Sequence, residues 1–364
     1  MKKILLWVLV SFFPTFVSAG VVASGDNCGT NCSWKVEDVT NENGTTSRRL
    51  TVYATDSTKT GSMASWDDVT RAPTIAWKDY KSTITDVVIE GSASKNENGT
   101  YSNVTGIVNI GYGAFSGCKK LKNVSVPTSV NRVESTAFDG ASALSNINIP
   151  DSVKSISLAS FRGTKALTEL VLPSSVTSIA NSAFSGATGL KSVKIEGAVK
   201  SLGRSAFEGD KKLEVVELGD GIQTIGATAF KNATNLKALV IPETVTKIEW
   251  NAFENTTSLK TLIIPASVKT IDSAVFKGSG LEELWCMKSM ESKCKTAINS
   301  SSLDEGILRL YTKTDDGKYI FNGKKYASLV DMYAGKSMTK RIYTVQEAEA
   351  VSKNTGNKFR IRYK

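Results

Sequence analysis

Five cysteines are the residues of this sequence with the clearest chemistry. Cys28 and Cys32 lie four residues apart, Cys286 and Cys294 lie eight apart, and Cys118 is left alone. In an oxidising compartment, cysteines are expected to form disulfides. Pairing each cysteine with its nearest neighbour in the sequence then predicts the disulfides Cys28–Cys32 and Cys286–Cys294. The alternative for the first pair is half of a metal site, but the sequence has no second pair at that spacing and no His to complete it.

The 364 residues contain no histidine. Ser-His-Asp and Cys-His catalysis are therefore excluded, as are zinc sites with imidazole ligands. The sequence also lacks a nucleophile elbow, a P-loop and a dinucleotide-binding fingerprint. Catalysis by a pair of carboxylates, as in a hydrolase of polysaccharides, remains formally possible. We expect no catalytic residue, no metal and no cofactor, and therefore a protein that is not an enzyme.

The first 19 residues have the pattern of a signal peptide. Lys2 and Lys3 precede an apolar run, and Val17-Ser18-Ala19 places small residues before a cleavage point. The apolar run is too short for a comfortable membrane span and contains Pro14. We expect an exported protein, secreted or at the cell surface with the periplasm as an alternative, and no transmembrane segment in the mature chain.

A phenylalanine repeats along the middle of the chain at a constant interval of 23 residues. It stands at positions 115, 138, 161, 184, 207, 230, 253 and 276. Two residues after it comes Gly in six repeats and Asn232 or Asn255 in the other two. Gly and Asn tolerate a left-handed backbone, so a tight turn is predicted after each Phe.

Each repeat also carries apolar residues at spacings typical of strands. A Leu follows the Phe by six residues, and then come two apolar residues two apart, such as Val193 and Ile195. This spacing predicts a short strand with one face inward. A second apolar pair three apart, such as Val199 and Leu202, must return along the opposite side of the coil. No single coil can bury these residues alone, so the repeats must stack.

This pattern, AFxGxxxLxxVxIPxSVxxI, resembles the BspA-type leucine-rich repeats of bacterial and protist surface proteins, over about residues 84–286. The resemblance implies a repeat solenoid, a right-handed superhelix that is mostly β, with a parallel sheet on its concave side and short strands or turns on its convex side. Members of that family are described as adhesins and interaction proteins. The expected division is a signal peptide (1–19), a β-rich N-terminal cap (20–83), the solenoid (84–300) and a small α+β C-terminal module (301–364).

The two ends of the stack need residues that cover its core. Strands are predicted at 33–37 and 50–53, and Trp66, Trp77 and Tyr80 could cover the first coil. About 14 polar residues within 92–105 interrupt the period and are expected to form an exposed loop. Past residue 303 we expect strands at 307–311 and 319–321, a helix at 344–353 and a strand at 358–364. A Cys286–Cys294 bond would hold the closing segment over the last coil.

Most of the net charge of +10 lies at the C-terminus, because residues 336–364 hold eight Lys and Arg against two Glu. A basic strand there could contact an anionic lipid or glycan, although a solvated edge strand is the favoured interpretation. Export makes nucleic acid a poor choice of partner.

The strand residues between the inward ones form outward columns that vary from coil to coil, while the inward residues do not. Val171, Val240 and Ile263 would be exposed apolar residues there, of the kind that anchor protein contacts. We therefore expect recognition of host or neighbouring-cell proteins, with a glycan-binding module as the alternative and a hydrolase third. The glycan alternative is disfavoured because the columns contain no aromatic residue. The candidate contact residues are Lys122, Ser125, Asn148, Val171, Lys191, Lys194, Glu214, Glu217, Lys237, Val240, Lys260 and Ile263.

Overall fold

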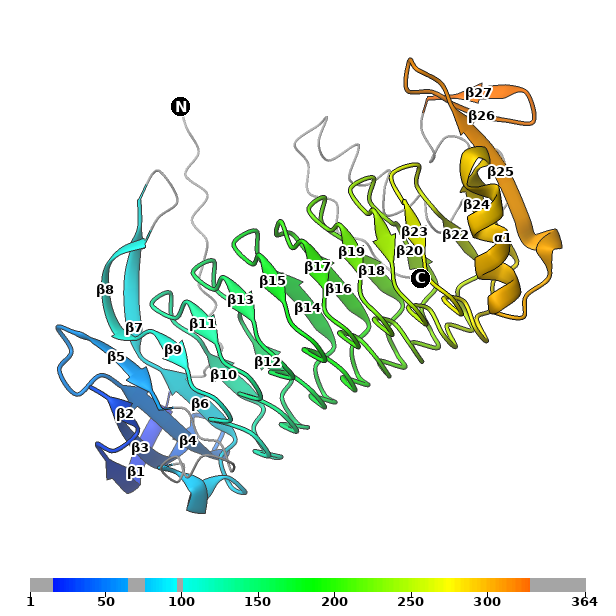
Figure 1. Cartoon of the computed structure of the whole chain (residues 1–364). Coiled ribbons are helices and arrows are strands. Elements are labelled where there is room, and N and C mark those ends of the chain that lie inside the picture. Colours follow the sequence, from blue (N-terminus) through cyan, green and yellow to red (C-terminus); the bar gives the residue numbers. More distant parts are fainter. Residues whose placement is uncertain (1–15, 65–75, 97–100, 328–364) are drawn as a thin grey trace.

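The computed structural model describes residues 16–64, 76–96 and 101–327. Figure 1 shows a stack of coils that runs from the N-terminal strands at one end to a helix and hairpin at the other. Each coil has a short strand on one side, where the first apolar pair predicts it, and a strand of two residues on the opposite side, where the second pair returns. The chain is therefore the expected, mostly β, repeat solenoid.

The first side of the stack carries one parallel strand per coil, and we call its outward surface the strand face. Val193 pairs with Val216, its equivalent in the next repeat. These strands belong to three hydrogen-bonded groups, which end at β12, run from β14 to β20, and begin at β22. The strands are β6 (Asp86–Ile89), β10 (Asn123–Ser125), β12 (Asn146–Ile147), β14 (Glu169–Leu172), β16 (Ser192–Ile195), β18 (Val215–Glu217), β20 (Ala238–Leu239), β22 (Thr261–Ile263) and β24 (Glu283–Met287).

The opposite side carries eight strands of two residues each, which form one continuous parallel sheet. We call its outward surface the short-strand face. The strands are β9 (Asn109–Ile110), β11 (Arg132–Val133), β13 (Ser155–Ile156), β15 (Ser178–Ile179), β17 (Ser201–Leu202), β19 (Thr224–Ile225), β21 (Lys247–Ile248) and β23 (Thr270–Ile271).

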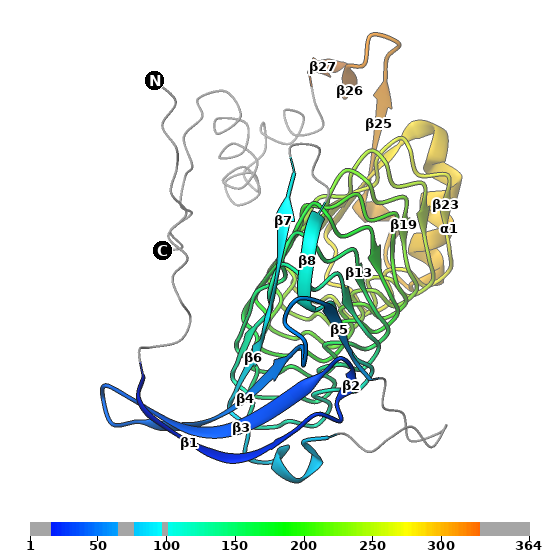
Figure 2. The same ribbon diagram turned by 90° about the vertical axis from the view of Figure 1, so that its left-hand side faces the viewer.

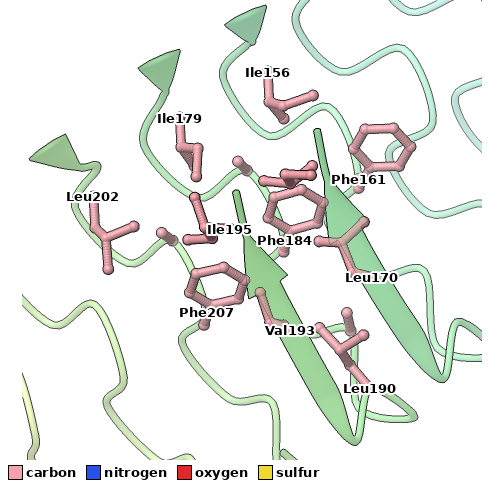
Figure 3. Packing of buried hydrophobic residues seen from close by; sticks show 14 of the residues in the cluster. Ile156, Phe161, Leu170, Ile179, Phe184, Leu190, Val193, Ile195, Leu202 and Phe207 are labelled. Carbon is pink, nitrogen blue, oxygen red and sulfur yellow. The ribbon is translucent and has the colours of Figure 1, made fainter. Parts of the chain in front are cut away.

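The repeated phenylalanines stack on one another through the middle of the core. All eight are fully buried, and successive ring centroids lie 5.2 to 6.1 Å apart with nearly parallel planes. Figure 3 shows three of these rings between the Leu, Val and Ile side chains of the two strand sides. Burial of a large apolar side chain contributes about 1.5–3 kcal/mol, so each coil depends on its two neighbours for this stabilisation.

The turn after each Phe has the predicted left-handed backbone, with φ between 59° and 78° at the Gly or Asn. A second left-handed residue, two positions before each Phe, was not predicted. It is a glycine only at Gly113, and the others are Thr136, Ala159, Ser182, Ser205, Thr228, Asn251 and Ala274.

Hydrogen bonds between neighbouring repeats explain this second conformation. In one repeat the amides of Ala159, Phe161 and Gly163 all donate to carbonyl oxygens of the following repeat, at 3.0, 2.8 and 2.9 Å. The left-handed residue turns its N–H along the stack instead of into its own coil. The bond to the next repeat offsets the roughly 1–2 kcal/mol that this conformation costs a residue with a Cβ.

The N-terminal cap is an antiparallel sheet that joins the stack directly. It contains β1 (Phe16–Gly25), β3 (Ser33–Asn41) and β4 (Thr46–Tyr53), and β4 pairs in parallel with β6. Figure 2 shows these strands across the end of the coils. Strand β1 begins four residues before the predicted cleavage point, so cleavage there would leave a strand starting at Gly20. Two short strands, β2 (Gly29–Thr30) and β5 (Thr60–Met63), pair beside the cap.

Trp77 covers the first coil, as predicted. It precedes the short helix η1 (Lys78–Tyr80), is fully buried and stacks on Phe115, and Trp34 packs edge-on against it at 6.5 Å. Tyr80 is half-buried against the same core, whereas Trp66 lies outside the described residues.

The insertion at 92–105 is not a loop, which corrects the expectation from its polar composition. Its described part is an antiparallel hairpin of β7 (Gly91–Lys95) and β8 (Tyr101–Ile107), and β8 also pairs with β5. Figure 2 shows this hairpin rising beside the coils. Polar side chains do not prevent strand formation where the backbone finds partners on both sides.

The C-terminal end is closed by an element that we did not predict from the sequence, the helix α1 (Glu291–Ser300), which follows the short helix η2 (Lys288–Met290). It buries Cys294, Ala297 and Ile298 against the last coil. After η3 (Glu305–Ile307), strand β25 (Leu308–Lys313) pairs in parallel with β24 and so extends the strand side of the solenoid. It is followed by the hairpin β26 (Tyr319–Phe321) and β27 (Lys324–Tyr326), whereas the predicted elements at 344–353 and 358–364 lie outside the described residues.

Candidate protein-binding face

The strand face collects most of the predicted contact residues on one surface. Lys122, Lys191, Lys194, Lys237 and Lys260 are all exposed there, and Ser125, Glu214 and Glu217 are half-buried. The common interval of 23 residues puts equivalent side chains side by side, because paired strands lie about 4.8 Å apart. The columns inferred from the sequence are therefore real rows of neighbouring side chains.

Opposite charges alternate along the centre of this face. Lys194 on β16 is paired in register with Glu217 on β18, and its ammonium lies 3.3 Å from Glu196. Further along, Lys237 donates to Glu214 at 2.8 Å. At the end of the face, Lys260 lies 3.0 Å from Glu282. Exposed ion pairs of this kind contribute little to stability because water and salt screen them, so they are free to exchange for charges on a partner.

Two apolar side chains stand out among these charges. Val171 of β14 is 55% exposed, and Val240, which directly follows β20, is 42% exposed. They are three repeats apart, or roughly 15 Å at the spacing of about 4.8 Å between strands. Apolar residues exposed between charged ones are typical anchors of protein contacts.

Ile263, the third apolar residue predicted to be exposed, is only half-buried. It packs against an aromatic cluster formed by Trp285 of β24, Tyr311 of β25, and Tyr319 and Phe321 of β26. Tyr319 donates to Glu243 at 2.7 Å, and Tyr311 donates to the carbonyl of Ile264 at 2.7 Å. The hairpin thus folds back over the last part of the strand face. The contact between Tyr319 and Glu243 could not be predicted from the sequence, because the two residues lie 76 positions apart.

Asn148 has a structural role in addition to its exposed position. Its side-chain amide donates to the carbonyl of Val126 at 2.9 Å and accepts from the amide of Val126 at 3.2 Å. The side chain thus bonds to both backbone groups of Val126, as the backbone of a neighbouring strand would. Removing Asn148 would change the sheet as well as its surface.

A third outward column, one residue after the column that contains Lys122, Lys191 and Glu214, was not predicted from the sequence. Asn146 donates to Asn123 at 2.7 Å, and Asn123 donates to Asp86 at 2.7 Å. Thr85 donates to the other oxygen of Asp86 at 2.7 Å. Asn residues 23 apart were the signal that could have revealed this row of bonded side chains.

Other exposed apolar residues lie away from the strand face. Leu158 is 49% exposed and Trp250 is 40% exposed, and each lies two residues after a strand of the short-strand face. The guanidinium of Arg204 lies 4.9 Å from the centroid of the Trp250 ring. These two residues match Val171 and Val240 in exposure but occupy the other side of the coil.

Both predicted cysteine pairs lie at disulfide distance. The sulfurs of Cys28 and Cys32 are 2.02 Å apart, and those of Cys286 and Cys294 are 2.14 Å apart. Cys286 is fully buried on β24, which pairs with β22, and its partner lies on α1. Cys118 is free and buried, and burial raises the pKa of its thiol to about 12, so it is not a reactive nucleophile.

Within the described ranges, no cluster of three or more His, Cys, Asp or Glu is placed to hold a metal ion. Over the same residues, no helix has the length and apolar character needed to cross a bilayer. The basic stretch 336–364, a second candidate for partner contacts, lies outside the part of the chain that the structure describes.

Solved structures with a similar fold come from several bacteria. A leucine-rich repeat protein from Bacteroides ovatus is 23% identical with a TM-score of 0.50, over 74% of this chain and 58% of that one. The T. pallidum leucine-rich repeat protein is 24% identical with a TM-score of 0.41, over 60% and 81%. The pneumococcal vaccine antigen PcpA is 20% identical with a TM-score of 0.34, over 75% and 82%. At 23% identity, the likeness to the Bacteroides ovatus protein shows the fold alone.

The chain spans 58% of the length of the Bacteroides ovatus protein. A comparison with curated proteins gave no match. A model of the BspA type leucine rich repeat region matches in six copies, over residues 89–214 and 200–327, which is more than half of the 364 residues. Its repeats coincide with the coils described above, and the chain therefore belongs to the BspA-type leucine-rich repeat family.

Proposed function

We propose that this chain is an exported, surface-associated or secreted scaffold that binds other proteins through its strand face. The observation that carries the proposal is the contrast between the two sides of each strand. Inward residues are nearly invariant in character from coil to coil, whereas outward residues alternate among Lys, Glu, Asn and Val. A constant core that displays a varied surface is what a recognition scaffold requires.

The chemistry of the face indicates the kind of partner. Lys191 and Lys194 lie one repeat before Glu214 and Glu217, so positive and negative charges stand side by side. Val171 and Val240 lie on either side of this group. A partner surface of mixed charge with apolar side chains would complement it, and charge complementarity would set specificity more than affinity. We propose surface or matrix proteins of a host or of neighbouring cells as partners.

Export rests on the N-terminal sequence pattern and on the cysteines. Two local cysteine pairs at bonding distance are typical of oxidising compartments. We propose that residues 1–19 are removed and that β1 keeps its pairing from Gly20 onward. Val21 and Ala23 would then still pair with Glu37 and Val36.

The test is binding of the purified protein to a panel of soluble matrix and surface proteins, measured by surface plasmon resonance. Partners identified in this way are then tested against the triple variant Lys191→Glu, Lys194→Glu, Glu217→Lys. Reversal of close charge pairs is expected to weaken binding by about tenfold or more. The matched control, Lys200→Glu with Lys269→Glu, changes two exposed lysines on the short-strand side and should leave affinity unchanged. Equal losses in both variants would contradict the proposal, as would no loss in the first.

A further inference from the structure

The inserted hairpin forms a pocket with the coils beside it. The pocket has a volume of about 230 Å³. Tyr101 and Val104 of β8 line one wall, and Ser129, Asn131, Ser152 and Lys154 of two successive repeats line the other. Because the hairpin interrupts the 23-residue period, this pocket belongs to the one coil that carries the insertion.

The two walls are held together by specific contacts. The hydroxyl of Thr128 accepts from the amide of Ala93 at 3.1 Å and donates to its carbonyl at 3.3 Å. Ser129 donates to the carbonyl of Ile107 at 2.6 Å. At Gly91 a Cβ would lie 2.1 Å from the Ser129 hydroxyl, so only glycine allows this close approach. The pocket is therefore built before any ligand arrives.

The charge inside the pocket comes from one residue. Asp151, next to the lining, is already paired with Lys95 of the hairpin at 3.0 Å. No ion pair is found for Lys154 among the residues that the structure describes. Its ammonium therefore gives the pocket a net positive charge. An anionic group is the ligand component that this charge selects.

Apart from Lys154, the pocket has one apolar wall and one polar wall. Tyr101 and Val104 present an apolar wall, and burial raises the pKa of Tyr101, so its phenol stays neutral and can donate. Opposite them, the side chain of Asn131 has no hydrogen bond to any described residue. Ser129 and Ser152 donate to backbone carbonyls, which leaves their oxygens as acceptors.

We propose that this pocket binds a single acidic sugar residue, such as a uronic acid at the end of a glycan. A sugar ring offers a C–H face for Tyr101 and Val104, hydroxyls for Asn131 and the two serines, and a carboxylate for Lys154. The volume lies below the roughly 300–1,000 Å³ of sites for drug-sized ligands, which fits one ring rather than an extended chain. The aromatic residue expected for glycan binding thus lies on the inserted hairpin, away from the strand face.

The experiment is saturation-transfer NMR of the purified protein with glucuronate, glucose and acetate, followed by titration to obtain dissociation constants. We expect glucuronate to bind about tenfold more tightly than glucose, and acetate not to bind detectably. Lys154→Met should reduce glucuronate affinity about tenfold, to the level of glucose, since it removes one charged hydrogen bond. The control Lys200→Met changes the equivalent lysine two repeats away and should bind like the parent.

Tyr101→Ala should abolish binding of both sugars, and an unchanged melting temperature would show that the fold persists. Asn131→Ala, at a residue that no hairpin contact uses, gives a second test and should weaken both sugars. The proposal is overturned if glucuronate does not bind, if acetate competes with it equally, or if Lys200→Met is as damaging as Lys154→Met. None of these outcomes bears on protein binding at the strand face, so the two proposals fail independently.

Discussion

The indole ring of Trp77 stacks on the ring of Phe115, with centroids 5.6 Å apart and planes inclined by 16°. The spacing and the tilt are those found between successive phenylalanines of the solenoid. Trp77 therefore occupies the place of the repeated phenylalanine in the coil that contains β6. Its Nε1 donates to the carbonyl of Ala114 at 3.0 Å, so the polar atom of the indole is satisfied as well.

Trp77→Ala should destabilise the protein by about 3–5 kcal/mol, because it opens a cavity above the first phenylalanine. Trp77→Phe should recover most of this loss, since it restores the ring but not the hydrogen bond. Chemical denaturation measures both. The control is Trp250→Ala, at a tryptophan that is 40% exposed, and it should cost less than about 1 kcal/mol. Similar losses for the two alanine variants would contradict the capping role of Trp77.

Asp210 is a carboxylic acid in the core of the solenoid, with no exposed surface. Equivalent positions hold Thr164 and Thr256, whose hydroxyls donate to the carbonyls of Phe161 and Phe253. Burial raises the pKa of Asp210 well above its ordinary range, against the opposite effect of nearby backbone amides. The folded protein therefore keeps a proton that the unfolded chain releases near pH 4.

The free energy of unfolding should consequently fall as the pH rises above about 4, because the unfolded state binds fewer protons than the folded state. Asp210→Thr removes this dependence and should be more stable than the parent at pH 7, with the difference shrinking towards pH 4. Thermal melts at several pH values measure it. The control Asp220→Asn, at an exposed aspartate, should retain the parental pH profile. A parent whose stability does not change relative to Asp210→Thr over this range would rule the explanation out.

Substitutions at Gly163 measure the cost of the left-handed conformation in the turn after each phenylalanine. Its φ is 69°, and the nearest atom to an added Cβ is the Cα of Gly140 at 3.7 Å, so space is available and only conformation is costly. Gly163→Ala should cost about 1–2 kcal/mol. Gly163→Asn should cost less, because Asn232 and Asn255 already hold this position with φ of 61° and 59°. Denaturation curves in which alanine is tolerated better than asparagine would argue against this reason for the repeat's Gly/Asn choice.

The bond between Cys286 and Cys294 is expected to hold α1 on the last coil. Replacing both by Ala should lower the free energy of unfolding by about 2–3 kcal/mol, the entropy of closing a loop of this length. Mass spectrometry of peptides from the unreduced protein provides the direct check. The matched control replaces Cys28 and Cys32 by Ala. This substitution removes the other disulfide and should leave proteolysis of α1 unchanged. Absence of a linked 286–294 peptide would remove the prediction.

The solenoid could be predicted in detail because all of its repeats share the same residue pattern. A Phe every 23 residues, a Gly or Asn two residues later and two spaced apolar pairs determine the coil, its turns and its inward side. The left-handed residue before each Phe was missed because a conformation normally reserved for Gly is occupied there by Thr, Ala and Ser. Only the hydrogen bonds to the next repeat explain it, and these are tertiary contacts.

The ends and the surface were harder to predict because they occur once. Helix α1 contains few apolar residues, and the polar hairpin at 91–107 forms through pairing with β5. The aromatic residues that pack against Ile263 come from a different part of the chain. Asn148 likewise bonds to Val126 of the preceding repeat. The spacing within each repeat predicts which side chains point outward, but not the hydrogen bonds that they form.

Partner proteins are proposed to bind at the strand face, and site-specific photo-crosslinking tests this binding mode most directly. A photoreactive residue is placed at Val171 or Val240, and in matched variants at Leu158 or Trp250, which are equally exposed on the other side of the coils. In the presence of a bound partner, crosslinks should form from positions 171 and 240 and not from 158 and 250. Crosslinks from 158 and 250 with none from 171 and 240 would contradict the assignment of the binding face.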